Sequence, residues 1–337
     1  MKRPIFKENL RTAMSHEKRG ERGAMGPIRV GVIGVGSLGQ HHARLYADIP
    51  EADLVAVVDT DDGRAHAIAA RHRCQALAHF QDLFGQVDAV SIAVPTPLHH
   101  RIARKCLEGG VHVLVEKPMT ATLDDAQDLV EIAEAQKVIL QVGHIERFNS
   151  ALRAGLGAIK GPRLIECRRW APFTPRGADV DVVLDLMIHD LDIVLSVLGS
   201  EVQTVEAQGV SLVSSTTDVA HARVLFDTGC TAIFSASRVA EAKVRELRFY
   251  EPESFLVVDL LEQTARIGRR IIGPEGDTKI IAELIRGDRQ EALKLELQAF
   301  LESVRQRTPP LVSGNDGVAA LRLAERIMAQ IKRGGVA

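Results

Sequence analysis

The chain has 337 residues, a length that indicates two domains rather than one core. A hydrophobic fraction of 46% and a charged fraction of 26% are typical of a soluble globular protein, and a net charge of −2 does not suggest binding to nucleic acid or to an anionic membrane. No run could span a membrane, and the four cysteines show neither disulfide nor zinc spacing. We therefore expect a cytoplasmic protein with small-molecule partners.

Residues 1–26 are polar and basic and lack the apolar segment of a secretory signal. We expect a disordered extension, or sequence upstream of a start at Met25. An arm that binds nucleic acid is the less favoured alternative. The coherent pattern of strands and helices begins at Ile28.

A glycine-rich motif follows the first predicted strand, Ile28–Ile33, and opens a helix that runs through Tyr46. The next predicted strand, Leu54–Val58, is followed by Asp59, and the segment Thr60-Asp61-Asp62 after it would repel a 2′-phosphate. The glycines let a pyrophosphate approach the helix N-terminus, and the acid can accept hydrogen bonds from ribose hydroxyls. The pattern therefore favours NAD as the cofactor, although Arg64 is near enough that NADP remains an alternative. The predicted cofactor residues are Gly34, Gly36, Ser37, Leu38, Gly39 and Asp59.

Strands and helices continue to alternate up to residue 142. Strands are predicted at Val87–Val94, Val111–Val115 and Val138–Val142, and helices at Leu98–Glu108 and Leu123–Gln136. This alternation predicts a doubly wound parallel sheet, in which ligands bind beyond the carboxyl ends of the strands. The residues at such ends are Pro95, Thr96, Glu116 and Lys117.

The pattern changes after residue 148. A strand at Arg163–Trp170 precedes a helix at Val182–Gly199, and helices return at Arg289–Arg305 and Asp316–Lys332, the last expected to pack on the first domain. Extended segments between them suggest an antiparallel sheet with one open face, through which a homo-oligomer (dimer or tetramer) would form. These segments are 204–210, 220–227, 231–238, 245–250 and 255–259.

The helix at Val182–Gly199 is apolar on most sides and therefore predicted to be buried. Its polar residues Asp185, His189, Asp192 and Ser196 fall within roughly 60° on a helical wheel. A carboxylate one turn before an imidazole can be a merely structural pair. A metal site is less favoured, because no thiolate or second histidine stands nearby at ligand spacing.

Five segments carry a resemblance to a known family: GVIGVGSLG at 31–39, PTPLH at 95–99, VEKP at 115–118, DLMIHD at 185–190 and PLVSGNDGVAALRLAE at 310–325. Together they resemble the Gfo/Idh/MocA family of nicotinamide-dependent sugar oxidoreductases. The resemblance implies an α/β fold with an NAD-binding Rossmann domain at 27–147, a substrate and oligomerisation domain with a large, mostly antiparallel open sheet at 148–310, and a C-terminal helix at 311–337. It also implies that His99 contacts the cofactor and that the Lys-Pro bond of the third segment is cis.

By the same resemblance, the catalytic residues are Lys117, Asp185 and His189. An imidazole suits removal of the hydroxyl proton near neutral pH, the carboxylate would orient it or hold the sugar, and the ammonium would stabilise the developing alkoxide. Asp192 and Ser196 are expected to contact backbone or sugar.

The stretch GHIERFN at 143–149 resembles the branch that acts on UDP-N-acetylhexosamines, in particular the 3-dehydrogenases that oxidise UDP-N-acetylglucosamine before an aminotransferase acts in lipid A assembly. Ser150 departs from this branch, where many members have proline. A dehydrogenase of a free sugar or cyclitol and a non-catalytic NAD-binding regulator remain alternatives. A UDP-sugar would need cations for its diphosphate, and the expected ones flank the loops that lead to the helix at 182–199: Arg147, Arg169 and Arg176. The other expected substrate-binding residues are Asn149, Asp185 and His189.

Overall fold

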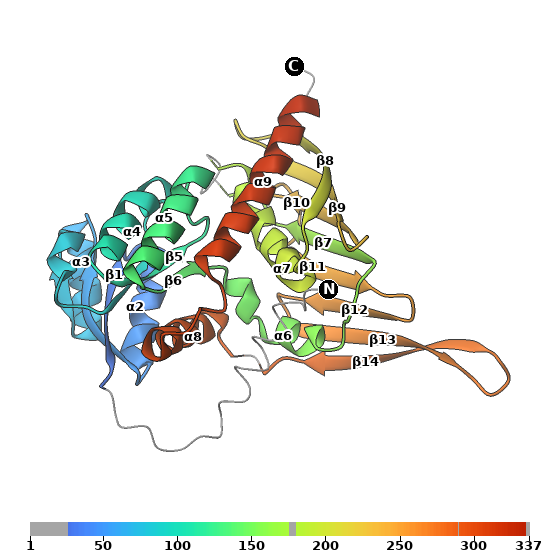
Figure 1. Cartoon of the computed structure of the whole chain (residues 1–337), viewed down its shortest axis with the longest axis horizontal. Coiled ribbons are helices and arrows are strands. Elements are labelled where there is room, and N and C mark those ends of the chain that lie inside the picture. The colour runs from blue at the N-terminus through green and yellow to red at the C-terminus, as the bar shows by residue number, and fades with distance from the viewer. Residues whose placement is uncertain (1–25, 175–179, 289, 335–337) are drawn as a thin grey trace. The chain divides into compact units, whose positions relative to one another are not determined.

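The computed structural model describes residues 26–174, 180–288 and 290–334, and their contacts form two compact units (Figure 1). The N-terminal unit comprises the described residues up to Ile145 together with 291–318. The sheet unit comprises residues 146–290 and those from 319 onward, apart from the segments not described. The expected disordered extension at 1–26 lies outside the described residues, except for Gly26.

Six parallel strands form the sheet of the N-terminal unit, in the order β3-β2-β1-β4-β5-β6. This is the strand order of a dinucleotide-binding Rossmann fold, and it confirms the predicted doubly wound sheet. The strand β3 was not predicted, because its three residues are too short for a hydrophobic pattern. The bounds are β1 (Ile28–Ile33), β2 (Ala52–Val58), β3 (Gln75–Leu77), β4 (Ala89–Ile92), β5 (His112–Glu116) and β6 (Leu140–Gly143).

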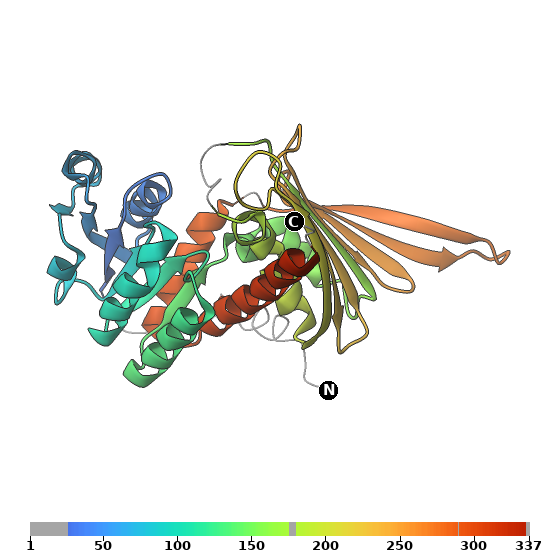
Figure 2. The same cartoon turned by 90° about the horizontal axis from the view of Figure 1, so that it is seen from above.

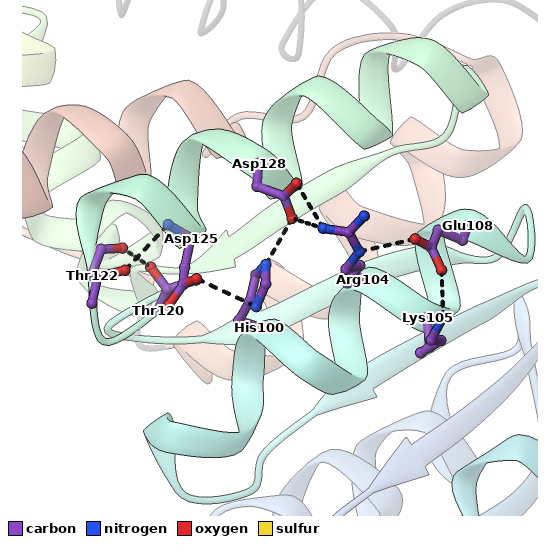
Figure 3. Close-up of polar contacts among 8 residues, drawn as sticks. All are labelled: His100, Arg104, Lys105, Glu108, Thr120, Thr122, Asp125 and Asp128. Atoms are coloured by element: carbon purple, nitrogen blue, oxygen red, sulfur yellow. Dashed lines mark hydrogen bonds and ion pairs between the residues drawn. The ribbon is translucent and has the colours of Figure 1, made fainter.

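Helices connect and cover these strands. Their bounds are α2 (Gly39–Asp48), α3 (Asp62–His72), α4 (His99–Glu108), α5 (Leu123–Gln136) and α8 (Ala292–Gln306), with short 3₁₀ turns η2 (Phe80–Leu83) and η3 (Thr96–Leu98). On the outside, α4 and α5 are joined by ion pairs in which His100 and Arg104 both contact Asp128 (Figure 3). Leu297 and Phe300 of α8 lie in the same core as Leu45 of α2.

Eight strands form the second sheet, in the order β14-β13-β12-β11-β7-β10-β9-β8. All neighbouring pairs are antiparallel except β7 and β10, as the mostly antiparallel prediction required. The bounds are β7 (Leu164–Trp170), β8 (Val202–Val210), β9 (Val219–Phe226), β10 (Thr231–Ser237), β11 (Val244–Tyr250), β12 (Ser254–Asp259), β13 (Thr264–Ile272) and β14 (Thr278–Arg286).

One face of this sheet is covered by helices (Figure 2). The apolar residues that pack there include Leu152, Leu191 and Ile327, each from a different helix. The helices and turns of the unit are η4 (Ile145–Phe148), α6 (Ser150–Leu156), η5 (Val183–Met187), α7 (Ile188–Leu198) and the greater part of α9 (Gly314–Gly334). Within the described residues, no helix combines the length and apolar character needed to span a membrane.

The contacts differ from the expected domain boundaries at the C-terminal end. Residues 291–310 were expected in the second domain, yet α8 buries its apolar face in the core of the N-terminal unit. The last helix was expected on the first domain, and its residues 314–318 do belong to the N-terminal unit, but Leu323, Ile327 and Ile331 of α9 lie in the core of the sheet unit. Amphipathic helices can be recognised from sequence, but their apolar face does not identify the sheet that it covers.

The hairpin of β13 and β14 extends beyond the neighbouring strands (Figure 2). Its far part carries exposed isoleucines among charged residues, and β14 forms one edge of the sheet. Edge strands with exposed apolar side chains are typical sites of association between chains. The exposed apolar residues are Ile271, Ile272, Ile280, Ile281 and Leu284.

Candidate active site

The glycine-rich turn joins the end of β1 to α2. Gly34 has a φ of +83°, which disfavours any side chain at that position. A Cβ atom on Gly39 would lie 1.7 Å from the carbonyl oxygen of Gly34, so the helix can begin there only with glycine. No side chain caps this end of α2, where the helix dipole favours a pyrophosphate. The turn therefore fits a dinucleotide.

Asp59 stands at the carboxyl end of β2. Its Oδ2 atom accepts a hydrogen bond from the N–H of Val35 at 3.0 Å, and Oδ1 accepts one from Asp61 at 2.9 Å. These bonds fix the carboxylate beside the glycine-rich turn while each oxygen keeps a lone pair for a ribose hydroxyl. The guanidinium of Arg64 pairs with Asp61 at 2.8 Å, so that its charge is already balanced. This arrangement favours NAD over a phosphorylated cofactor.

The carboxyl ends of β4 and β5 are linked by His99. Its Nε2 atom lies 2.8 Å from the carbonyl oxygen of Val94, and its Nδ1 atom lies 2.9 Å from that of Pro118. Burial lowers the pKa of His99, although both carbonyls favour the protonated ring. The Lys117-Pro118 bond is cis, as expected. Pro95 and Thr96 begin the turn η3 that leads into the helix of His99.

The residue before Lys117, Glu116, is paired with the buried His42. The Nε2 atom of His42, on α2, lies 3.1 Å from Oε1 of Glu116. The other carboxylate oxygen accepts a bond from the N–H of Lys117 at 3.3 Å. Burial alone would raise the pKa of Glu116, but His42 and the ammonium of Lys117 outweigh it and the pKa is lowered. Through its bond to the N–H of Lys117, Glu116 supports the backbone at that residue.

In the sheet unit, Asp185 and His189 lie on the predicted helix, but that helix is not uniform. Residues 183–187 form a π-helical turn, η5, and the α-helix begins only at Ile188. A π turn contains an extra residue and is frequent at functional sites, so a wheel at about 100° per residue does not hold through Asp185. Both side chains are half-buried.

The start of η5 is fastened to the neighbouring sheet. The N–H of Val182 donates to the carbonyl oxygen of Thr217 at 3.0 Å, and Arg238 donates to the carbonyl oxygen of Val180. Asp218 lies 3.8 Å from that guanidinium and is fully buried. These contacts fix the backbone just before Asp185.

Two of the three arginines expected to bind the substrate diphosphate are buried in ion pairs. Arg147 donates two hydrogen bonds to Asp192, at 2.6 and 2.8 Å. Arg169 is bidentate on Asp190, with a shortest contact of 2.7 Å, and also donates to Glu146 at 2.8 Å. Their positive charge is thus matched by carboxylates of the chain itself. Asp192 contacts the guanidinium of Arg147.

Other expected site residues also serve the fold. Asn149 caps α6 and donates from its amide to the carbonyl oxygen of Leu260 at 3.0 Å. Ser196 donates to the backbone of Ile193 at 2.7 Å, which confirms the expected backbone contact. Arg176 lies outside the described residues. In the part of the chain that is described, no three histidine, cysteine or acidic side chains are grouped to hold a metal ion.

Sequence reasoning missed the partners of these arginines. Asp190 lies off the polar stripe of the helix, and Glu146 and Arg245 were not singled out, although the last two form an ion pair at 3.1 Å. The sequence did carry a signal for them. Asp190 and Asp192 lie in a helix that is predicted to be buried on most sides, and buried carboxylates require buried cations.

Two family models match the chain. The "Oxidoreductase family, NAD-binding Rossmann fold" model covers residues 28–144, and the "GFO/IDH/MocA C-terminal domain" model covers residues 143–251. They meet close to the boundary between the two units.

Similar proteins agree with the family models. The UDP-N-acetylglucosamine 3-dehydrogenase of Acidithiobacillus ferrooxidans is 37% identical over 90% of this chain and 97% of its own length. The solved structure of that dehydrogenase matches with a TM-score of 0.87 at 36% identity, over 92% of this chain and 99% of its own. Inositol 2-dehydrogenase 1 of Saccharopolyspora erythraea is 30% identical over 88% of this chain and 92% of its own length. This chain belongs to the Gfo/Idh/MocA family of NAD-dependent oxidoreductases.

Proposed function

We propose that this enzyme oxidises the C3 hydroxyl of UDP-N-acetylglucosamine to a ketone and transfers the hydride to NAD. The observation that carries this proposal is the similarity to a UDP-N-acetylglucosamine 3-dehydrogenase over 97% of that relative's length. The half-buried Asp185 and His189 on a mostly apolar helix support it, since the reaction needs a proton acceptor.

Each proposed catalytic residue has one task. Bound NAD supplies the hydride acceptor. The turn at 34–39 and the carboxylate of Asp59 hold it. The imidazole of His189 takes the proton from the C3 hydroxyl, and Asp185 orients the ring and favours its protonated form. The ammonium of Lys117 donates to the same oxygen and stabilises its developing negative charge.

The product also has a proposed fate and the enzyme a proposed setting. A 3-keto sugar nucleotide is a substrate for an aminotransferase, and we place this step before amination in lipid A assembly, in the cytoplasm. The relative's activity supports this place in the pathway.

The enzyme is further proposed to work as a homo-oligomer through the sheet face that helices do not cover. The exposed apolar hairpin of β13 and β14 adjoins that face and supports association with a second copy.

A substrate panel tests the reaction. UDP-N-acetylglucosamine, UDP-N-acetylgalactosamine, UDP-glucose, myo-inositol and scyllo-inositol are each supplied with NAD, and the absorbance of NADH is followed. We expect turnover with UDP-N-acetylglucosamine and a ketone at C3, located by NMR of the product. Oxidation at another carbon would contradict the assigned position.

A second candidate is an inositol-type dehydrogenase, because a relative of that activity is 30% identical over most of both chains. Turnover of the inositols without that of UDP-sugars would establish it. NAD binding with no turnover of any compound in the panel would instead favour the non-catalytic regulator.

A further inference from the structure

Helix α7 carries two buried carboxylates that leave it on different sides. Asp190 and Asp192 are two residues apart, and their directions therefore differ by roughly 200° around the helix axis. Both side chains are almost completely buried. A buried carboxylate requires a charged or hydrogen-bonding partner, and each of these has one from a different part of the sheet unit.

Each carboxylate is held by a two-point contact. On one side, Arg147 of η4 binds Asp192 through Nε at 2.6 Å and a terminal nitrogen at 2.8 Å. On the other side, Arg169 of β7 binds Asp190 through Nε at 3.1 Å and a terminal nitrogen at 2.7 Å. A planar guanidinium on a carboxylate fixes orientation as well as distance.

A third carboxylate, Glu146, belongs to the same cluster. Glu146 accepts from Arg169 at 2.8 Å and from Arg245 at 3.1 Å. Three carboxylates therefore face three guanidinium groups. Replacing a buried ion pair by apolar residues often leaves stability unchanged or raises it, so stability alone gives little reason for such a cluster. Its distinctive effect is geometric, because anchors on two sides prevent rotation of α7.

We propose that Arg147 and Arg169 are positioning residues that hold α7 through Asp192 and Asp190, in the orientation that presents His189 to the substrate. This proposal rests on the proposed role of His189 as the base. It assigns the two arginines to the helix rather than to the substrate diphosphate. His189 lies directly before one anchor and three residues before the other, so a small rotation of α7 displaces its ring.

The test compares Arg147→Lys and Asp192→Asn with Arg248→Lys. The last variant is a matched control in the same unit, because Arg248 binds Glu246 through Nε and a terminal nitrogen but lies nearer the surface. We expect kcat to fall at least about tenfold in the first two variants, since a misplacement of about 1 Å can cost a hundredfold in rate. The KM of the sugar and the Kd of NAD should stay within about twofold.

Hydrogen exchange measured by mass spectrometry gives a second readout, without any substrate. Peptides that cover residues 183–198 should exchange faster in Arg147→Lys and Asp192→Asn, and not in Arg248→Lys. If Asp192→Asn does not fold, judged by NAD binding and thermal unfolding, Arg147→Lys carries the test because it keeps the charge.

Several outcomes would overturn the positioning role. A rise in the KM of the sugar at unchanged kcat would mean that Arg147 binds the substrate directly. Unchanged kinetics and exchange in α7 would mean that the anchors are dispensable. If the wild-type enzyme oxidises only inositols, the proposed substrate fails while the ratios of kcat still test the anchors. If the wild-type enzyme oxidises no compound of the panel, the rate of hydrogen exchange in α7 alone decides whether the arginines anchor the helix.

Discussion

The imidazole of His42 and the carboxylate of Glu116 connect the helix after the glycine-rich turn to the strand that ends at Lys117, through a contact of 3.1 Å. The side chain of His42 is almost completely buried, and that of Glu116 is 12% exposed. The cofactor-binding turn and the proposed catalytic lysine therefore share one support within the N-terminal unit.

Replacing His42 by leucine should make the protein more sensitive to acid. The folded-state pKa of Glu116 is lowered, so ionised Glu116 stabilises the fold above its ordinary pKa, and this stabilisation is lost as pH falls through the folded value. Without His42, burial dominates and that pKa rises. The midpoint of acid unfolding, followed by circular dichroism, should move to higher pH. His66→Leu, at an exposed histidine paired with Asp62, should leave the midpoint unchanged.

Asp59→Asn should weaken NAD binding. Loss of a hydrogen bond to a charged group costs about 1.5–3 kcal/mol, which corresponds to roughly a ten- to hundredfold rise in Kd. Calorimetric titration with NAD measures the change. Asp53→Asn, at an exposed position on the same strand, is the control and should bind normally. Equal affinity of Asp59→Asn and wild type would show that this carboxylate does not hold the ribose.

Gly39→Ala should disrupt the N-terminal unit, because its Cβ would overlap the carbonyl oxygen of Gly34 and the neighbouring atom is backbone. We expect a loss of at least about 2 kcal/mol in the free energy of unfolding, together with loss of NAD binding. Gly157→Ala meets no atom within 4 Å and should be neutral in the same urea titration. A normal midpoint for Gly39→Ala would contradict the close approach of helix and strand.

His189→Ala should remove most turnover while leaving NAD binding intact. General base catalysis contributes about 10²- to 10⁴-fold, and kcat should fall by that factor. Steady-state kinetics with the oxidised substrate and a Kd for NAD measure the two effects. His41→Ala, at an exposed histidine on α2, serves as the comparison. Turnover at the wild-type rate in His189→Ala would exclude this residue as the base.

Charges on the projecting hairpin should weaken self-association. Ile272→Lys combined with Ile280→Lys places two ammonium groups in the exposed apolar part of β13 and β14. Light scattering after size exclusion should give a multiple of the 36.7 kDa chain for wild type and a smaller mass for the variant. Leu212→Lys, at an exposed leucine outside the hairpin, should keep the wild-type mass. A monomeric wild-type protein would refute the proposed assembly.

The parts of the fold that sequence predicts well are those in which hydrophobic pattern and environment agree. The strand at Ile28–Ile33 is apolar except for the exposed Arg29 because its other residues are buried on both faces, and the glycines after it have a single steric explanation. The strands β13 and β14 escaped prediction because charged residues interrupt their apolar ones and most side chains of β14 are exposed. Along most of β14, neither face is packed against a core, so its sequence shows no alternation of apolar and polar residues.

The candidate site shows a different limit. The sequence identified Arg147 and Arg169 as cations near the second domain's helix, but a sequence does not specify which anion a guanidinium meets. Their partners Asp192 and Asp190 are 45 and 21 residues away along the chain, and only the folded sheet unit brings them together. The contacts of these two arginines therefore could not be predicted from the sequence.

Because of the π turn at Val183–Met187, Asp185 points in a different direction from the one that a regular α-helix continued from α7 would give it. Removing one residue from the part of this turn that follows Asp185 would restore α-helical winding. The chain before the deletion, Asp185 included, would then be rotated by about 100° relative to α7. Asp185 would then point elsewhere, while His189 and the two buried ion pairs would keep their places. A one-residue change in length, rather than a change of side chain, is therefore enough to separate the carboxylate from the imidazole.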